Sequence, residues 1–302
     1  MNIANDRASD VDAALAAVRV CRIGGSVPAV SADVLAVEEP LEIRLDYEEG
    51  GRRVRRPVSV TMRTPGHDAE LAVGFLFSEG IVSSREQVAG VRVCGHGGAV
   101  RVELAPGVAV DITRLERHFF ATSSCGVCGK ASIDSVRLPG RSILDRQRPV
   151  VDAAIIHRLP AALRSAQPVF EHTGGLHAAA LFDARGDLQC LREDVGRHNA
   201  LDKVIGAQFL AGHTPLADGV LFLSGRVGFE LIQKAAVAGI PIVAAVGAPS
   251  SLAVSLADEQ GMTVLGFVRD DRFNIYSGAG RVRQAANVVG RDVADALPSA
   301  VS

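Results

Sequence analysis

Between residues 197 and 267 the chain alternates amphipathic helical segments with short, uncharged apolar segments. The predicted elements are a helix over 197–211, a strand over 220–223, a helix over 229–238, a strand over 240–246, a helix over 251–259 and a strand over 262–267. Strands that are apolar at every position are typical of a parallel sheet buried on both faces. Parallel neighbours need helical crossovers, so the sequence predicts an α/β fold with a parallel or mixed sheet covered by helices.

The part of the chain before this alternation predicts a smaller, strand-rich unit. Strands are expected over 41–47, 58–62, 91–94 and 100–104, with one helix from His67 to Gly80; a helix over 153–166 and a hairpin of 176–182 with 188–191 follow later. The expected organisation is a partly ordered leader over 1–35, a strand-rich subdomain over 36–120, a mobile loop over 121–132 and an α/β cofactor-binding domain over 133–302.

Charge and hydropathy exclude several classes of protein. The 32 Lys+Arg nearly balance the 34 Asp+Glu, which argues against a general nucleic-acid binder. Hydrophobic residues make up 48% of the chain, too many for a disordered protein. The longest uncharged stretch, 235–257, is interrupted at Pro241 and Pro249, and residues 1–7 do not resemble a secretory signal. We therefore expect a cytoplasmic protein that neither enters nor binds a membrane.

Cysteine usage points to thiol chemistry. The five cysteines are Cys21, Cys94, Cys125, Cys128 and Cys190, an odd number that does not favour a disulfide framework. Cys125 and Cys128 form a CxxC pair in a segment of small residues and glycines, which is loop composition. The nearby Lys130 can lower the pKa of a thiol and so favour the reactive thiolate.

Four kinds of site use a CxxC pair. Structural zinc needs a second ligand pair, and the upstream candidates Cys94 and His96 lack its spacing. Zinc deamination needs an H-x-E motif, which none of the eight histidines supplies. Because neither kind of zinc site has its full set of ligands, no metal site is predicted. A thioredoxin-like pair follows a buried strand, whereas 115–120 is a poor one. A sulfur relay, in which a mobile cysteine carries a persulfide, stays open because thiol exchange needs an accessible thiolate.

Four further segments can form a ligand site at the ends of the strands. The stretch 192–203 is rich in charged residues, and it is either an ordinary helix start or a site wall that includes Asp194 and His198. Glycine-rich turns at 224–228 and 247–251 follow predicted parallel strands, where free backbone N–H groups at helix starts favour phosphate. The fourth segment consists of Phe267, Val268, Arg269, Asp270, Asp271 and Arg272. It is either an ordinary solvated charged loop or a site whose two arginines hold phosphate.

Seven segments in the same order resemble the FdhD family. They are Arg63–Leu71, Ser124–Lys130, Thr173–Ala180, Arg192–Lys203, Phe229–Ala235, Ala248–Leu252 and Gly261–Thr263. Each motif alone is modest, but the ordered set between about residue 60 and residue 276 is highly specific. The first 35 residues and the tail after Tyr276 contribute little to the resemblance.

The resemblance implies a formate dehydrogenase accessory sulfurtransferase. Such a protein accepts sulfur from a cysteine desulfurase and passes it to the bis-molybdopterin guanine dinucleotide form of the molybdenum cofactor, which then activates formate dehydrogenase. The family's persulfide carrier corresponds to Cys125, Cys128 also matters, and 267–272 corresponds to the cofactor-binding stretch, for which GDP is a possible analogue. The resemblance also implies a cytidine-deaminase-like main domain and a homodimer.

The competing interpretation is a chaperone that binds the phosphate-rich cofactor without transferring sulfur, and a zinc-stapled interaction module is the third. Everything from residue 195 onward fits the chaperone equally well. The CxxC pair distinguishes the two, because a chaperone should tolerate replacement of Cys125 and a carrier should not.

Overall fold

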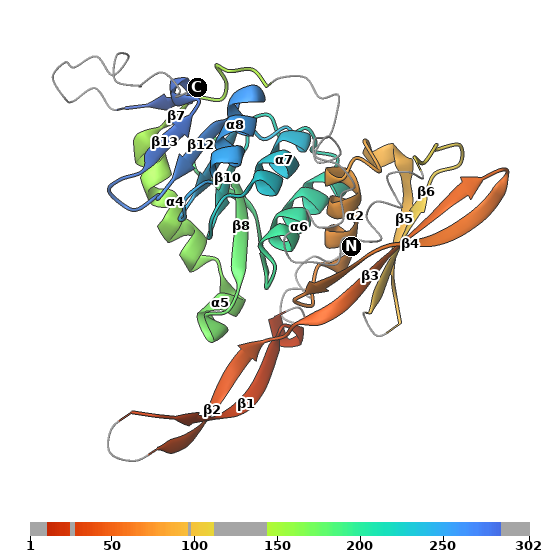
Figure 1. Ribbon diagram of the computed structural model, residues 1–302, viewed down its shortest axis with the longest axis horizontal. Helices are drawn as coiled ribbons and strands as arrows, with labels where there is room; N and C mark the ends of the chain where they lie inside the picture. Colours follow the sequence, from red (N-terminus) through yellow and green to blue (C-terminus); the bar gives the residue numbers. More distant parts are fainter. Residues whose placement is uncertain (1–10, 25–27, 96–97, 112–143, 285–302) are drawn as a thin grey trace.

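The computed structural model describes residues 11–24, 28–95, 98–111 and 144–284 (Figure 1). Its largest sheet has six strands in the order β13-β12-β11-β10-β8-β9. The strands are β8 (His177–Phe182), β9 (Leu188–Asp194), β10 (Val220–Leu223), β11 (Ile242–Ala245), β12 (Thr263–Gly266) and β13 (Asn274–Ser277). The expected parallel pairing holds for β10, β11 and β12. The other pairs are antiparallel because β8 and β9 form a hairpin beside β10 and β13 folds back on β12, so the sheet is mixed.

Both faces of this sheet are covered by helices, which explains the continuous apolar strands. Along β10, Leu221 and Leu223 pack into the core on one side, whereas Val220 and Phe222 pack into the core on the other. The first side carries α6 (Arg197–Leu210), α7 (Phe229–Val237) and α8 (Ser251–Glu259), and the second carries α4 (Ala153–Ser165), as Figure 1 shows. Since both faces are covered along β10 and β11, these two strands are apolar at every position.

A four-stranded sheet, in the order β4-β3-β6-β5, forms the strand-rich part. Its strands are β3 (Glu39–Glu49), β4 (Arg52–Arg63), β5 (Val88–Cys94) and β6 (Ala99–Leu104), and the 3-10 turn η1 (Arg85–Gln87) precedes β5. Leu41, Ile43 and Leu45 alternate with polar residues along β3 and face the core shared with α2 (Asp68–Ser78). The opposite face carries ion pairs such as that between Arg55 and Asp46, so among the described residues only one face of this sheet packs into the core.

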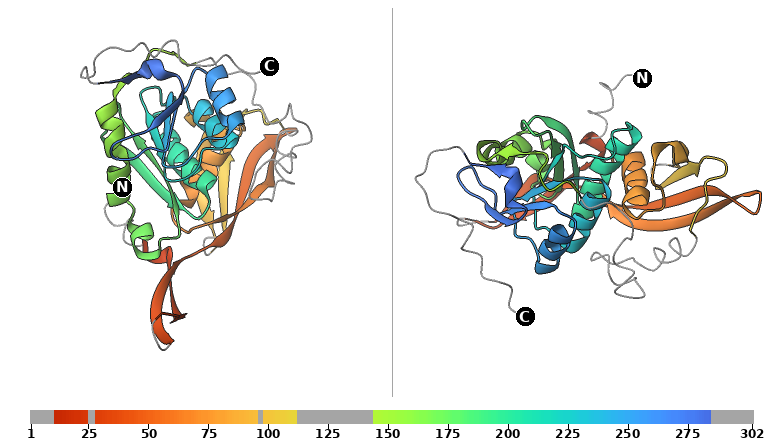
Figure 2. Two further views of the ribbon diagram at one scale, coloured as in Figure 1. Left: turned by 60° about the vertical axis from the view of Figure 1, so that its left-hand side comes forward. Right: turned by 90° about the horizontal axis from the view of Figure 1, so that it is seen from above.

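The two parts of the molecule are joined where α2 crosses α6 (Figure 2). A Cβ atom placed on Gly74 would lie 1.8 Å from the backbone oxygen of Asp202, and one on Gly206 would lie 1.9 Å from that of Glu70. Backbone therefore packs directly on backbone at this crossing, and only glycine fits at either position. The crossing fixes the strand-rich part relative to the six-stranded sheet.

The remaining elements lie at the periphery. The strands β1 (Leu15–Arg22) and β2 (Ala29–Ala36) form an antiparallel hairpin that projects from the body, inside the segment expected to be a partly ordered leader. Its base packs on α5 (Pro168–Thr173) through Ala14, Val169 and Leu176. The short strands β7 (Val151–Asp152) and β14 (Val282–Arg283) pair in parallel, and the 3-10 turn η3 (Ala279–Arg281) precedes β14. Within the described residues, no helix is both long and apolar enough to cross a membrane.

Candidate functional site

Four segments singled out in the sequence meet at one edge of the six-stranded sheet. The parallel strands β10, β11 and β12 all end at this edge, followed by residues 224–228, 247–251 and 267–272. β8 is antiparallel to β10, and β9 is antiparallel to β8. As a result, β8 begins and β9 ends at this same edge of the sheet. The start of the 192–203 segment, which includes the end of β9, therefore lies at this edge together with the three turns. The carboxyl ends of parallel strands are where open α/β sheets bind ligands.

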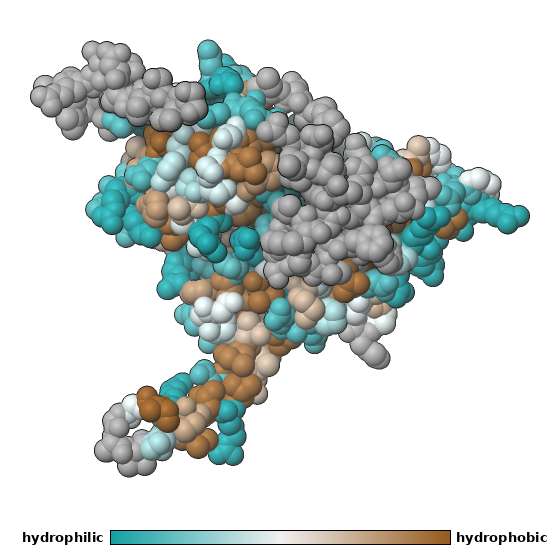
Figure 3. Space-filling model, in the orientation of Figure 1, coloured by the Kyte–Doolittle hydropathy of each residue, from teal (hydrophilic) through white to brown (hydrophobic). Residues whose placement is uncertain are grey.

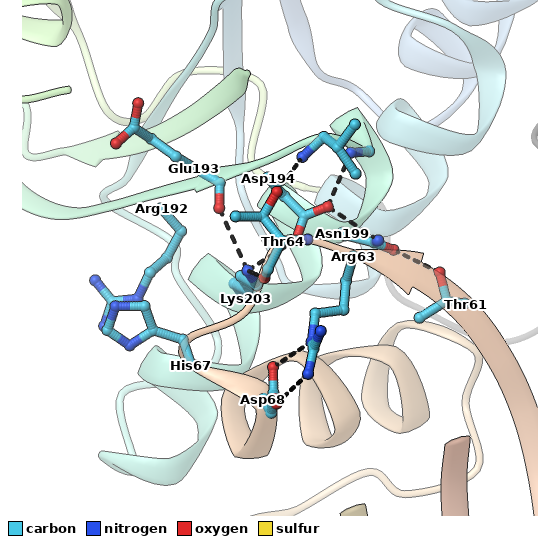
Figure 4. Close-up of polar contacts among 12 residues, drawn as sticks. Thr61, Arg63, Thr64, His67, Asp68, Arg192, Glu193, Asp194, Asn199 and Lys203 are labelled. Atoms are coloured by element: carbon cyan, nitrogen blue, oxygen red, sulfur yellow. Dashed lines mark hydrogen bonds and ion pairs between the residues drawn. The ribbon is translucent and has the colours of Figure 1, made fainter. Parts of the chain in front are cut away.

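The turn between β9 and α6 is held by a buried network centred on Asp194 (Figure 4). Its carboxylate accepts hydrogen bonds from the backbone N–H groups of Thr64 and Gly196, at 3.2 and 2.8 Å, and from Nδ2 of Asn199 at 3.1 Å. Nζ of Lys203 lies 2.7 Å from Oδ2 of the same carboxylate. Asp194 is completely buried. It therefore fixes the turn between β9 and α6 from within the protein and does not form the expected site wall.

The same network joins β4 to the main sheet. Nδ2 of Asn199 also donates to the backbone oxygen of Met62 at 2.7 Å, and Lys203 donates to that of Thr64 at 2.9 Å. The buried guanidinium of Arg63 pairs with both oxygens of Asp68 at the start of α2, at 2.8 and 2.9 Å. The conformation of the 192–203 stretch therefore depends on residues about 130 positions earlier in the chain.

A second ion pair anchors the end of β9 on α2. Nε and Nη2 of Arg192 donate to the two carboxylate oxygens of Glu70, at 2.6 and 2.8 Å, and Nδ1 of His67 lies 3.5 Å from that carboxylate. Burial raises the pKa of Glu70, but the bonds from Arg192 and His67 outweigh burial and lower that pKa to about 2. His67 adopts the left-handed backbone conformation, with φ 59°, directly before α2. Glu70 is thus ionised across the physiological range.

Beside this turn, His198 is held as a neutral ring. Its Nε2 lies 3.1 Å from Oε2 of Glu230 on α7. Burial lowers the pKa of His198 to about 3, aided by the positive charges of Lys234 and Arg197. Lys234 itself is buried against Asp202, with Nζ 2.9 Å from Oδ2. A neutral His198 donates or accepts a hydrogen bond at pH 7 but does not supply a positive charge.

The stretch Phe267–Arg272 forms an exposed turn after β12. Val268 is buried under α4, while Phe267 is exposed with φ 54°, a left-handed conformation. Arg269 donates from Nη1 to the backbone oxygens of Val246 and Val268, at 2.9 and 2.8 Å, so part of its guanidinium already holds the turn. Arg272 is 76% exposed, and its nearest carboxylate is that of Asp271 at 4.0 Å. Of the two arginines, Arg272 has more hydrogen-bonding capacity left for a ligand.

A pocket of about 510 Å³ opens at the same edge, between α4, α5 and the ends of β8, β10 and β11. Sequence reasoning did not predict it, because its walls come from five segments. Its lining residues are Pro160, Leu163, Arg164, Gln167, Phe170, Gly174, Gly175, Leu176, His177, Ser224 and Val246. Two segments singled out in the sequence contribute to it: the Thr173–Ala180 motif, whose Gly174, Gly175 and His177 line the pocket, and the turn at 224–228, which begins with the lining residue Ser224.

The two cysteines predicted to carry the chemistry, Cys125 and Cys128, lie outside the described residues. Among those that are described, Cys21 is exposed on β1, Cys94 is half-buried at the end of β5 and Cys190 is buried in β9. Burial raises the pKa of Cys190, which makes its thiol less reactive. Cys190 therefore does not compete with the CxxC pair as the expected nucleophile.

The chain is similar to proteins that carry sulfur. The sequence model of the FdhD/NarQ family matches residues 36–283. A protein of Mycolicibacterium paratuberculosis named sulfur carrier protein FdhD is 52% identical over 258 residues, covering 83% of this chain and 92% of its own length. A protein of the same name from Streptomyces avermitilis is 47% identical over 273 residues, covering 87% of this chain and 94% of its own.

The fold also has a counterpart among solved structures. The crystal structure of a protein from Desulfotalea psychrophila, described as a formate dehydrogenase accessory protein, superposes with a TM-score of 0.67 at 24% sequence identity. The superposition covers 89% of this chain and 99% of the other. At this identity the likeness concerns the fold alone.

Proposed function

The chain belongs to the FdhD/NarQ family, and we propose that it is a sulfur carrier that serves formate dehydrogenase. The observation that carries this proposal is the identity of 47–52% to sulfur carrier proteins FdhD over more than four-fifths of the chain. The CxxC pair Cys125 and Cys128 supplies the thiols that such a carrier needs. The odd number of cysteines supports a reducing compartment, the cytoplasm, as the place of this reaction.

In the proposed loading step, Cys125 takes sulfur from the persulfide of a cysteine desulfurase. The Cys125 thiolate attacks the terminal sulfur, the new S–S bond forms on Cys125, and the desulfurase cysteine leaves as a thiolate. The step is an exchange between thiol and persulfide, so it needs no oxidant. Attack of the Cys128 thiolate on the inner sulfur, Sγ of Cys125, would then release hydrosulfide and leave a Cys125–Cys128 disulfide.

The acceptor in this proposal is the bis-molybdopterin guanine dinucleotide form of the molybdenum cofactor, bound as substrate at the carboxyl edge of the six-stranded sheet. Its pyrophosphates suit Arg269 and Arg272 and the backbone N–H groups at the starts of α7 and α8. Asp270 and Asp271 repel phosphate, but a carboxylate can accept hydrogen bonds from N1–H and the amino group of guanine. We expect Asp270→Ala or Asp271→Ala to reduce the preference for GDP over ADP, and an unchanged preference would end this role for both.

Two structural features implied by the resemblance belong to the same proposal. The mixed sheet with helices on both faces supports a cytidine-deaminase-like main domain. A homodimer is the proposed assembly, and the projecting β1–β2 hairpin supports it, because an isolated two-stranded hairpin has little stability of its own in water. A monomer in sedimentation at micromolar concentration would contradict the dimer without touching the sulfur chemistry.

Intact-protein mass spectrometry tests the sulfur carrier directly. The full-length protein, Cys125→Ser and Cys128→Ser are incubated with a cysteine desulfurase and free cysteine, with and without reductant. We expect the wild type to gain the mass of one sulfur atom, reductant to remove it and Cys125→Ser to lack it. Cys21→Ser is the matched control because Cys21 is exposed on β1 and outside the proposed chemistry.

The alternative, a cofactor-binding chaperone without sulfur transfer, gives the opposite result. No variant would then gain sulfur, and Cys125→Ser would still support maturation of formate dehydrogenase in cells that lack their own accessory protein. If Cys125→Ser gained as much sulfur as the wild type, the persulfide carrier would be another cysteine.

A further inference from the structure

The turn Phe267–Arg272 is held from α4 by a histidine that no step of the proposed sulfur chemistry uses. Nδ1 of His157 lies 3.2 Å from the backbone oxygen of Arg269. A carbonyl oxygen can only accept, so Nδ1 carries the hydrogen atom and donates it. The ring of His157 also packs on the ring of Phe273, directly after the turn, with the ring centres 5.1 Å apart. His157 therefore contacts the turn through one polar and one apolar interaction.

The rest of the turn is exposed and has few bonds of its own. The backbone N–H of Arg269 donates to the backbone oxygen of Arg272 at 2.8 Å, which closes the turn. Between them, Asp270 and Asp271 are exposed, and within the described part of the chain neither backbone N–H has a hydrogen-bond partner. Figure 3 shows hydrophilic residues over this turn. An exposed turn with so few bonds opens easily, so the contact from α4 has a large influence on its conformation.

The hydrogen bond from His157 fixes the orientation of the peptide unit that joins Arg269 to Asp270. This peptide unit is trans, so its C=O and N–H groups point in opposite directions. Because the carbonyl group of Arg269 points toward α4, the N–H group of Asp270 points away from α4. That N–H is thereby presented on the outer side of an exposed turn, where a ligand can reach it.

We propose that His157 is a positioning residue for the proposed cofactor site, and that it keeps the N–H of Asp270 turned outward to donate to a phosphate. The inference rests on the proposed function, which places the phosphates of the cofactor at this turn. It also explains how a turn with two adjacent carboxylates can hold an anion. A backbone N–H donates to phosphate whatever side chain its residue carries.

Two substitutions separate the hydrogen bond of His157 from the packing of its ring. His157→Phe keeps an aromatic ring against Phe273 and removes the donor. His157→Asn removes the ring and keeps a donor, because Nδ2 of asparagine lies close to the position of Nδ1 of histidine. If His157 acts through its donor, the asparagine variant should behave like the wild type and the phenylalanine variant should not.

Equilibrium dialysis of the full-length protein with GDP and with inorganic pyrophosphate tests the proposal. We expect His157→Phe to weaken the binding of both about fivefold, the usual worth of one hydrogen bond. His157→Asn restores the donor and should bind both within about twofold of the wild type. His213→Phe is the matched control, because His213 is also exposed and contacts Gln208 through Nδ1, at 3.0 Å, but follows the far end of α6.

Thermal unfolding distinguishes positioning of the turn from a role in stability. The hydrogen bond of His157 is exposed, so the melting temperatures of the ligand-free variants should change little. Weaker binding at an unchanged melting temperature would support the positioning role. A His157→Phe variant that melts well below the wild type but binds both ligands normally would make His157 a structural residue and overturn the proposal.

Three binding results would also overturn the proposal. They are equal affinities of the wild type and His157→Phe, an equal loss in His157→Asn and His157→Phe, and weaker binding of GDP with unchanged binding of pyrophosphate. Sulfur loading of Cys125, measured on the same variants by mass spectrometry, should not change. A wild type that binds neither ligand would contradict the proposed cofactor site and the role of His157 together. A wild type that binds both ligands no more tightly than His157→Phe would contradict the role of His157 alone.

Discussion

Nζ of Lys203 lies 2.7 Å from Oδ2 of Asp194, and both side chains are almost entirely inaccessible to water. Lys203 comes from α6 and Asp194 from the end of β9, so the pair fixes the turn that leads from the sheet into the helix. Asp194 also accepts the backbone N–H of Thr64, which follows β4. One buried carboxylate therefore connects the strand-rich part, the six-stranded sheet and α6.

Replacing Lys203 with Met should destabilise the fold strongly, because Asp194 would be left buried and unpaired. Removal of one partner from a buried ion pair costs about 3–5 kcal/mol in the free energy of unfolding. Urea unfolding at pH 7 measures this cost. Arg185→Met is the control, since Arg185 pairs with Asp183 on the surface and should leave stability nearly unchanged. A small effect of Lys203→Met would mean that Asp194 finds another partner or water.

The helix crossing between α2 and α6 predicts two intolerant glycines. Gly74→Ala and Gly206→Ala each place a Cβ atom within 2 Å of a backbone oxygen, so the helices must separate. Although alanine favours a helix by about 1 kcal/mol over glycine, we expect a net loss of at least about 3 kcal/mol, the upper end of ordinary overpacking. Thermal and urea unfolding measure it. Gly280→Ala, which meets no atom within 4 Å, should change stability little, and equal effects at Gly280 and Gly74 would contradict this explanation.

Stability should fall in acid through Glu70. Its pKa drops from the ordinary 4.5 to about 2 on folding, so the unfolded chain takes up the proton first as the pH falls. The stabilisation, about 3 kcal/mol, is complete above pH 4.5 and is lost progressively between pH 4.5 and 2. Urea unfolding of the wild type and of Glu70→Gln at several pH values tests this. The free energy of unfolding of the variant should lack the part of the pH dependence that Glu70 contributes between pH 4.5 and 2. Glu171→Gln, an exposed carboxylate of α5, is the control, and a parallel slope in Glu70→Gln and wild type would argue against the ion pair with Arg192.

The two arginines of the 267–272 turn should behave differently. Arg272 is exposed, so Arg272→Ala should weaken GDP binding about fivefold or more without changing the melting temperature. Arg269 also holds the backbone oxygens of Val246 and Val268, so Arg269→Ala should lower both affinity and stability. Equilibrium dialysis and thermal unfolding on the same samples separate the two effects. Identical behaviour of the two variants would show that the hydrogen bonds of Arg269 do not shape the turn.

Much of the fold was predictable because its elements have local causes. The apolar run Val220–Leu223, the helix over Phe229–Val237 and the pairing of β10 with β11 follow from hydrophobic pattern and helical crossovers. The β1–β2 hairpin was not predicted, since its residues alternate weakly and its side chains are exposed or only half-buried. The β8–β9 hairpin was predicted. The antiparallel pairing of β8 with β10 and of β13 with β12 was not, because an isolated strand does not encode the direction of its neighbour.

The candidate site divides in the same way. Three features can be read directly from the sequence, because each is a contiguous motif with its own chemistry or conformation: the CxxC pair, the family resemblance and the turns that follow β10, β11 and β12. The burial of Asp194 becomes visible only in the folded structure, as does the pocket that Gln167 lines with His177 and Ser224. Burial and ion pairing depend on which distant segments pack together, and that packing is a property of the whole chain.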